Sequence, residues 1–339
     1  MSEPTHRLQV VDVVAETADA RSLVFTKPEG EEFAYAPGQF LTLRVPDGRG
    51  GSIARCYSLS SSPHTDRDLQ VTVKRVDGGH GSNWLCDNIT PGSTVDVLAP
   101  AGVFTPKSLE GDLLLLAGGS GITPIMSIIK SALARGRGRI VLVYANRDQE
   151  SVIFAEALRD LAARHPGRLT VVHWLESVQG LPEAAALRAL VEPYADHEVF
   201  LCGPAAFMDL ATEALKSTTR ERVHVERFRS LQENPFDSSP APAPESDEDA
   251  GAVEVELDGQ RHRFAWPRRQ RLLDLLLEQG LDAPYSCRQG ACSACACRIT
   301  GGEVAMQHND ILEPEDLDEG IVLACQALPV TDEVHVSYE

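Results

Sequence analysis

Long hydrophobic runs are missing from this sequence of 339 residues. Its apolar runs, such as those at 113–117 and 275–277, are far too short to span a bilayer. The first residues run straight into an alternation of polar and apolar side chains and show no apolar core of a signal peptide. We therefore expect a soluble, cytoplasmic protein without membrane attachment.

Positive charge is also scarce, because 31 Lys and Arg stand against 50 Asp and Glu and give a formal net charge of −19. Such a surface repels phosphate backbones and anionic membranes, so we expect no nucleic acid and no lipid as a partner. The acidity either helps the protein to dock on a positively charged protein patch or only keeps it in solution, and the charge count favours neither.

A change of composition divides the chain. Residues 238–249 combine alternating proline with an acidic run and cannot bury enough apolar surface to fold, so we interpret 231–250 as a linker. Before it, short strands separated by Gly and Pro predict an antiparallel β-barrel over 1–108. The expected strands of this barrel include 8–14, 40–45, 69–76 and 94–98.

Two further modules follow from the change in hydrophobic period. Over 109–230, strands alternate with helices, which predicts an α/β domain with a parallel sheet. Over 251–339, two alternating strands around an Asp258-Gly259 turn precede a leucine-rich helix and a cysteine loop, which predicts an α+β domain of the β-grasp type. The expected elements are strands at 113–116, 140–144, 169–174, 199–202, 253–257 and 261–266, and helices at 124–134, 154–164, 204–215 and 272–278.

Four of the eight cysteines crowd into the segment 287–297. Cys287-x4-Cys292-x2-Cys295, followed later by Cys325, is the spacing of a plant-type [2Fe-2S] site. The small residues between them let backbone amides approach the sulfurs. Zinc is the alternative, but zinc knuckles favour two C-x2-C pairs and the sequence has one. The fifth thiol, Cys297, we interpret as a small buried hydrophobe.

The C-terminal module thus resembles a plant-type ferredoxin, and the chain before it resembles the ferredoxin-NADP reductase-like family. Five segments carry the second resemblance: 55–60, 78–85, 118–124, 202–204 and 226–228. Together they resemble oxygenase reductases with a C-terminal ferredoxin domain, which implies the order flavin domain, nicotinamide domain, [2Fe-2S] domain.

The Arg-x-Tyr-Ser segment at 55–58 is similar to the flavin signature of this family. Arg55 can neutralise phosphates, Tyr57 can stack along the cofactor and Ser58 can reach its redox-active ring nitrogen. The glycines that precede Ser82 and Asn83 suit a pyrophosphate cradle. The resemblance implies FAD, with FMN as the alternative because one branch with the same module order uses it. The predicted flavin residues are Arg55, Cys56, Tyr57, Ser58, Thr72, Lys74, Gly81, Ser82 and Asn83.

The segment 118–124 follows four leucines and predicts a strand, a glycine turn and a helix, with Thr123 as the N-cap and Pro124 as the first helical residue. A dinucleotide pyrophosphate can approach such a turn. Arg147 would accept a 2′-phosphate and Asp148 would repel one; the resemblance favours NADH over NADPH. The predicted nicotinamide-nucleotide residues are Gly118, Gly119, Ser120, Gly121, Thr123, Arg147, Asp148, Gly203 and Pro204.

The resemblance also implies a set of residues where hydride moves. Cys202 would pack near nicotinamide and flavin, unless it is an ordinary core cysteine. Phe228 would cover the flavin face until nicotinamide displaces it, unless it is only a linker contact. The predicted catalytic residues are Ser58, Cys202, Glu226 and Phe228.

Electron counting gives the expected activity. NADH donates two electrons as hydride, the cluster accepts one at a time, and a flavin converts between them. The resemblance implies a terminal Rieske-type oxygenase as the acceptor. Segments 55–60, 82–88, 103–106, 144–148 and 173–177 look like the reductase components of 3-ketosteroid-9α-monooxygenases, which implies steroid degradation. The alternatives are a reductase of an aromatic-ring or phenylacetyl-CoA oxygenase and a redox-sensing binding protein.

Overall fold

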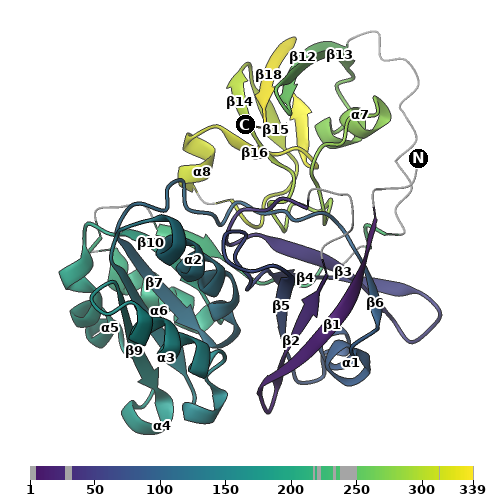
Figure 1. The fold of residues 1–339 in the computed structure, drawn as a ribbon. Coiled ribbons are helices and arrows are strands. Elements are labelled where there is room, and N and C mark those ends of the chain that lie inside the picture. The colour runs from purple at the N-terminus through teal and green to yellow at the C-terminus, as the bar shows by residue number, and fades with distance from the viewer. Residues whose placement is uncertain are drawn as a thin grey trace.

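The chain is described by a computed structural model that covers residues 5–26, 33–216, 218–219, 223–231, 234–236, 250–312 and 314–338. Figure 1 shows three modules: an antiparallel barrel and an α/β domain side by side, and a smaller domain above their junction. The linker interpreted at 238–249 lies outside the described residues, and the boundaries at 108, 230 and 250 stay predictions. Among the described residues, no helix combines the length and the apolarity that crossing a membrane requires.

The first module is a six-stranded antiparallel sheet in the order β4-β3-β6-β1-β2-β5. A bridge between Leu59 and Val71 joins its two edges, so the sheet closes into the predicted barrel. Alternate residues such as Leu41, Leu43 and Val45 point inward and are fully buried. Its elements are β1 (His6–Thr17), β2 (Ala20–Phe25), β3 (Phe40–Pro46), β4 (Ser52–Ser58), β5 (Leu69–Lys74), α1 (His80–Asn88) and β6 (Thr94–Val97).

The second module is a five-stranded parallel sheet in the order β11-β10-β7-β8-β9. Both faces of its central strand are buried, which explains the run of four leucines. Leu113 and Leu115 pack under α2 and α3, whereas Leu114 and Leu116 pack under α5 and α6. The elements are β7 (Leu113–Gly118), η1 (Gly119–Gly121), α2 (Ile122–Arg135), β8 (Ile140–Asn146), η2 (Gln149–Ser151), α3 (Ala155–Arg164), β9 (Leu169–Leu175), α4 (Glu176–Gln179), α5 (Ala184–Val191), η3 (Glu192–Tyr194), β10 (Glu198–Cys202), α6 (Ala205–Leu215) and β11 (Val223–Glu226).

The strand order of this sheet reverses between β7 and β10. Ligands of open α/β sheets bind at such a switch point, beyond the carboxyl ends of the strands. Here those ends are followed by the glycine turn and by Cys202-Gly203-Pro204, and they approach very closely. A Cβ added to Gly121 would lie 2.1 Å from the Cys202 carbonyl oxygen. The glycine turn is therefore required by packing as well as by any ligand.

The third module has a five-stranded sheet in the order β13-β12-β18-β14-β16, with β12 and β18 parallel. Helix α7 packs its leucines on this sheet beside the buried Trp266, which is the predicted β-grasp arrangement. The elements are β12 (Gly251–Leu257), β13 (Gln260–Trp266), α7 (Leu272–Glu278), β14 (Ala296–Gly301), β15 (Val304–Met306), α8 (Pro314–Asp318), β16 (Ile321–Leu323), β17 (Ala327–Pro329) and β18 (Glu333–Ser337).

One helix start differs from the sequence expectation. Helix α2 begins at Ile122 with Gly121 as the N-cap, so Thr123 is not the cap and instead donates a hydrogen bond to the Ser120 carbonyl oxygen, at 3.0 Å. Helix α1 begins at His80 with Gly79 as the N-cap. Because glycine has no side chain, no side-chain cap forms at either helix start.

We predict that Gly136→Ala destabilises the nicotinamide-side module by about 1–3 kcal/mol, because overpacking costs that much. Gly136 caps the C-terminus of α2, and a Cβ on it would lie 1.7 Å from the Leu109 carbonyl oxygen. The matched control is Gly111→Ala, since a Cβ on Gly111 meets no atom within 4 Å. Thermal unfolding of the two variants checks this, and equal midpoints would contradict the described packing of 109–111 against α2.

Candidate functional site

The four spaced cysteines lie close together. Cys287, Cys292 and Cys295 are in the loop between α7 and β14, residues 279–295, which we call the cluster loop, and Cys325 follows β16. Cys287, Cys292, Cys295 and Cys325 are buried, with exposed fractions of 1, 7, 2 and 2%. Backbone amides point at their sulfurs: the N–H groups of Gln289 and Ala291 each donate to Cys287 Sγ at 3.3 Å. The N–H of Cys287 donates to Cys292 Sγ at 3.3 Å, and that of Cys325 to Cys295 Sγ at 3.5 Å.

These donors favour thiolates. Hydrogen bonds from the thiols of Cys292 and Cys325, together with the two amides, lower the pKa of Cys287. In turn, the hydrogen bonds to Cys287 raise the pKa of Cys292 and of Cys325. Four converging buried sulfurs in an amide-lined loop fit a [2Fe-2S] cluster. No three His, Cys, Asp or Glu side chains in the described ranges are arranged around a single metal ion, but a binuclear cluster shares its four thiolates between two irons.

The loop is held in an unusual backbone conformation. Arg288, Gly290 and Ser293 have positive φ values of 56°, 76° and 54°. The Arg288 guanidinium forms a largely buried ion pair with Asp274 of α7, which ties the loop to its own module. Cys297 lies on β14 in the core of the module, and burial raises the pKa of its thiol. Its surroundings are those of a buried hydrophobe.

A second site is a cavity of about 240 Å³ between the barrel and the α/β domain. Strands β4 and β5 and the start of α1 form its barrel side, whereas Ser120 and Thr123 reach in from the glycine turn. The predicted flavin residues that line it are Arg55, Cys56, Tyr57, Ser58, Thr72, Lys74, Gly81 and Ser82. Among the described lining residues there are cations, including Arg55 and Lys74, but no carboxylates.

The end of this cavity near α1 is suited to an anion. The nine-residue helix α1 has Gly79 as its N-cap, which provides no side-chain cap, and its first residues line the cavity, so its first amides and its dipole lie at the end where Arg55 lies. A Cβ on Gly81 would lie 2.9 Å from Arg55 Cγ, so the glycine lets the arginine pack over the helix start. Cations and helix amides at one end and an aromatic side chain, Tyr57, along the wall fit the pyrophosphate and the ring of FAD.

Asn83 is the one predicted flavin residue that does not line the cavity. Its Nδ2 atom donates to the carbonyl oxygens of Val76 and Gly79, at 3.0 and 2.6 Å, and so it holds the turn before α1. Ser82 has a related role, because its Oγ accepts a hydrogen bond of 3.1 Å from the Val76 N–H.

A third site is a larger cavity of about 460 Å³ at the switch point of the parallel sheet. Of the predicted nucleotide residues, Gly118, Gly119, Arg147 and Pro204 line it, while Ser120 and Thr123 face the flavin cavity instead. Gly121 and Gly203 do not line it; they permit the contact between β7 and β10, and a Cβ on Gly203 would lie 3.0 Å from the Gly118 nitrogen. The glycines and the open carboxyl ends of the strands fit a nicotinamide dinucleotide.

The acidic side chain in this cavity is not the predicted one. Asp148 does not line it and caps η2, because its Oδ1 accepts from the Ser151 N–H at 2.8 Å. Glu176, the residue after β9, lines the cavity together with Trp174. Sequence reasoning missed both residues, although they lie at the carboxyl end of a strand that shares the edge with the glycine turn.

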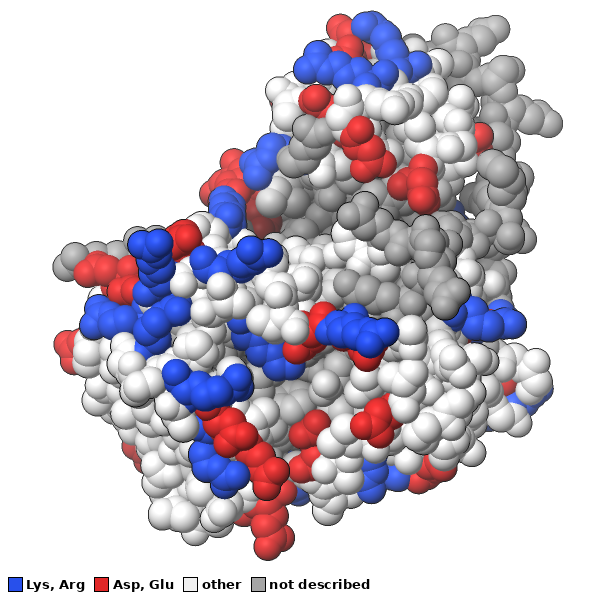
Figure 2. Space-filling model, in the orientation of Figure 1, with Lys and Arg blue, Asp and Glu red and all other residues white. Residues whose placement is uncertain are grey.

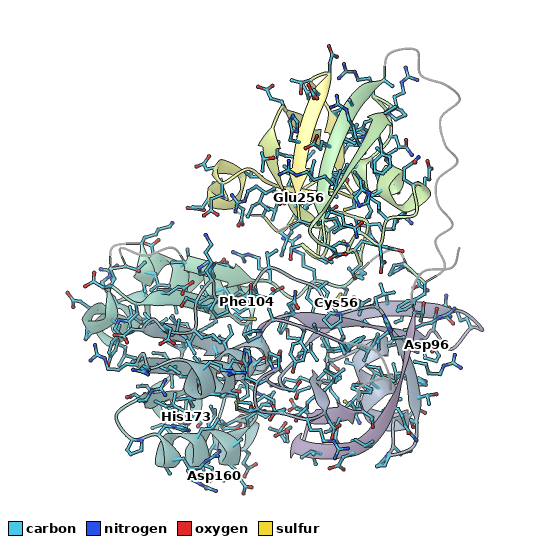
Figure 3. The ribbon with its side chains drawn as sticks, turned by 45° about the horizontal axis from the view of Figure 1, so that its top comes forward. Cys56, Asp96, Phe104, Asp160, His173 and Glu256 are labelled. Carbon is cyan, nitrogen blue, oxygen red and sulfur yellow. The ribbon has the colours of Figure 1, made fainter. Side chains whose placement is uncertain are left out.

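Three of the four predicted catalytic residues lie where the three modules meet. A small cavity of about 30 Å³ is lined by Ser58, Glu226, Phe228 and, from the cluster loop, Cys292. Phe228 is 48% exposed and also lines the flavin cavity, a position that suits a movable cover. Cys202 is fully buried and stands opposite Glu226 in the β10–β11 register. In Figure 3 the labelled Cys56 lies at the top of the barrel, facing the third module.

Glu226 is partly buried at the end of β11. It lines the cavity of about 30 Å³, which has room for one or two water molecules. Desolvation therefore raises the pKa of Glu226 to about 8. Burial, reinforced by this carboxyl group, also raises the pKa of the Cys202 thiol, so Cys202 is a neutral packing group.

Three family models match the chain in the order of its modules. They are an oxidoreductase FAD-binding domain over 7–105, an oxidoreductase NAD-binding domain over 115–213 and a 2Fe-2S iron-sulfur cluster binding domain over 255–330. The expected FAD, NAD and [2Fe-2S] groups are thereby confirmed. The models match these groups and not the alternatives, FMN and zinc.

Relatives match over nearly the full length. The 3-ketosteroid-9-alpha-monooxygenase ferredoxin reductase component of Mycolicibacterium smegmatis is 59% identical, over 98% of this chain and 96% of that protein. Its counterpart in Rhodococcus rhodochrous is 57% identical over the same shares, and one component of the 1,2-phenylacetyl-CoA epoxidase of Escherichia coli is 35% identical over 98% of both chains. The solved phthalate dioxygenase reductase has the same fold, with a TM-score of 0.60 at 24% identity over 98% of both chains. The chain belongs to the family of ferredoxin reductase components of 3-ketosteroid-9-alpha-monooxygenases, oxidoreductases built from an FAD, an NAD and a [2Fe-2S] domain.

Proposed function

We propose that this protein takes hydride from NADH onto FAD and passes single electrons through its [2Fe-2S] cluster to a Rieske-type oxygenase that hydroxylates a 3-ketosteroid in the cytoplasm. The observation that carries the proposal is the junction of the three modules. There, Cys292 of the cluster loop and Ser58 of the flavin cavity line one space of about 30 Å³. An electron leaving the flavin cavity therefore has only a few side chains to cross.

The bound groups supply the redox chemistry, since FAD accepts two electrons from NADH and releases them singly to the cluster. The chain holds and orients them. Arg55, Lys74 and the start of α1 would bind the pyrophosphate of FAD, and Tyr57 and Ser58 on adjacent positions of β4 would orient its ring. Because Lys74 lines both large cavities, it can interact with both cofactors.

Hydride transfer followed by the loss of electrons alone leaves one proton to be released for each NADH oxidised. Glu226 is suited to handle this proton, since its carboxyl group holds a proton up to about pH 8 and lines the space between Ser58 and Cys292. Cys202, with its raised pKa, stays neutral beside it.

Charges at the adenosine end of the nucleotide cavity favour NADH over NADPH. The exposed Glu176 would repel a 2′-phosphate and can accept hydrogen bonds from ribose hydroxyls. The cation there, Arg147, is paired with Asp19 of the barrel, with 3.3 Å between Nη2 and Oδ2. This ion pair offsets the charge that would otherwise attract a 2′-phosphate.

The partner is proposed from the relatives, because the surface in view does not identify it. Figure 2 shows acidic and basic side chains intermixed on this face, so the net charge of −19 does not mark one docking patch there. Two relatives at 57 and 59% identity are named for 3-ketosteroid-9-alpha-monooxygenase, whereas the one named for phenylacetyl-CoA epoxidase is 35% identical.

The test of the proposed function is reconstitution with purified oxygenases. With NADH, a 3-ketosteroid and a Rieske-type steroid oxygenase, the protein should support oxygen consumption matched by hydroxylated steroid. A phenylacetyl-CoA epoxidase oxygenase with its own substrate is the control. Efficient turnover with the control oxygenase and none with the steroid oxygenase would contradict the proposed partner.

We predict that Glu176→Gln raises kcat/KM for NADPH by roughly fivefold to tenfold, because an exposed charge pair contributes about 1 kcal/mol. The value for NADH should fall by less. The control is Glu150→Gln, which removes an exposed charge from the neighbouring η2 outside the cavity lining. If both variants change the NADPH/NADH ratio equally, the effect is one of net charge and Glu176 is not the determinant.

We predict that Glu226→Gln stabilises the FAD-loaded protein at pH 8 more than at pH 5. The pKa of Glu226 is about 8 in the folded protein and 4.5 in its ordinary state, so between these values unfolding releases a proton and the wild type loses stability as pH rises. Glutamine does not titrate. The midpoint of thermal unfolding of the variant, relative to wild type, should therefore rise by several degrees between pH 5 and pH 8. A constant difference would show that Glu226 is ionised in the folded protein.

A further inference from the structure

The third module rests on the barrel through a small apolar patch that includes two of the cluster cysteines. From the barrel come Phe40, Ala54 and Ala101, and from the cluster loop come Cys287, Cys292 and Ala294. Figures 1 and 3 show this loop against the top of the barrel, above β3 and β4. The loop that holds the cluster is therefore itself the contact surface between the two modules.

One buried hydrogen bond lies within this patch. Thr42 Oγ1 and Ser286 Oγ are 2.6 Å apart, and each residue has an exposed fraction of 1%. Thr42 lies in the middle of β3, and Ser286 directly precedes the cluster cysteine Cys287. The two residues are 244 positions apart, so this bond exists only when the modules are docked.

The same pair touches the flavin cavity through a single neighbour. Thr42 stands opposite Cys56 in the β3–β4 register, and Cys56 Sγ lies 3.4 Å from Thr42 Oγ1 and 3.9 Å from Ser286 Oγ. Cys56 lines both the flavin cavity and the small junction cavity. The Thr42–Ser286 hydrogen bond thus links Cys56, in the lining of the flavin cavity, with the residue that precedes the first cluster cysteine.

The two ion pairs across this interface contribute less to holding the modules together. Arg229 and Asp310 form an ion pair of 3.0 Å, and Lys107 and Glu319 one of 3.4 Å, but all four side chains are at least about a third exposed. Exposed ion pairs contribute little and are screened by salt. A hydroxyl pair in a buried, apolar patch is directional and is little affected by salt, so it fixes how the two surfaces align.

We infer that Thr42 and Ser286 are positioning residues that hold the cluster loop in its electron-accepting place beside the flavin. The inference rests on the proposed electron route from FAD to the cluster. Neither Thr42 nor Ser286 lines the flavin cavity or the nucleotide cavity. Their loss should therefore slow the second step, cluster reduction, and leave the first step, flavin reduction by NADH, unchanged.

The experiment is anaerobic stopped-flow mixing of the holoprotein with NADH, in which the flavin and cluster absorbance bands are followed separately. Thr42→Val keeps the side-chain shape and removes one hydroxyl; Ser286→Ala removes the other. Each should lower the rate of cluster reduction by up to about fivefold, because loss of one net hydrogen bond changes the docking equilibrium by about that factor. The double variant should resemble the single variants, because all three remove the same bond.

The matched control is a second buried hydroxyl pair at the other interface of the barrel. Ser62 Oγ and Ser131 Oγ are 2.8 Å apart, between the barrel and α2. Ser131→Ala should leave the rate of cluster reduction at the wild-type value. Iron and flavin content and the EPR spectrum of the reduced cluster should be unchanged in all variants, which separates positioning from damage to the cluster.

Two outcomes would overturn the inference. Cluster reduction at the wild-type rate in both Thr42→Val and Ser286→Ala would show that the bond does not position the loop. An equal loss of rate in flavin reduction and cluster reduction would indicate a general structural effect. Failure of the proposed function looks different, because then the cluster of the wild-type protein itself stays oxidised after its flavin is reduced.

Discussion

The structure depends on one junction between modules. There the flavin site, which handles two electrons, must lie very close to the cluster site, which handles one. Electron transfer needs the cluster loop against the flavin cavity, and hydride transfer needs the switch point of the parallel sheet against the same cavity. The barrel supplies both contacts from neighbouring strands: β4 carries Ser58 toward the flavin cavity, and β3 carries Thr42 toward the cluster loop. Three separately folded cores are thus arranged around one small space.

Glycine residues make these close approaches possible, because they carry no side chain. Gly121 lies against the Cys202 carbonyl group, and Gly81 lies beneath the Arg55 side chain. In the cluster loop, Gly290 has a φ of 76° and faces the His308 carbonyl oxygen. Each of these glycines places chain segments from different elements at distances that a Cβ would prevent. The polar groups around them then serve the cofactors: amides face the cysteine sulfurs and cations face the flavin cavity.

Much of this could be predicted from the sequence, because its signals are local. A few neighbouring residues suffice to recognise the four leucines of β7, the Asp258-Gly259 turn and the cysteine spacing. The fold class that they predict is confirmed. Contacts between distant segments could not be predicted in this way. Asp148 was expected at the nucleotide, yet its carboxylate caps the next turn, while Glu176, which follows another strand, lines the cavity. Ser120 and Thr123 face the flavin cavity because the modules pack side by side, and the Thr42–Ser286 pair joins residues 244 positions apart.

The most direct test of the electron route is anaerobic reduction of the holoprotein, and of the same protein stripped of FAD, with one equivalent of NADH while the cluster is observed by EPR. If electrons pass from the flavin cavity to the cluster across the junction, the holoprotein gives the signal of a reduced [2Fe-2S] centre and the FAD-free protein gives none. A reduced cluster in the FAD-free protein, or an oxidised cluster beside fully reduced FAD in the holoprotein, would contradict the account.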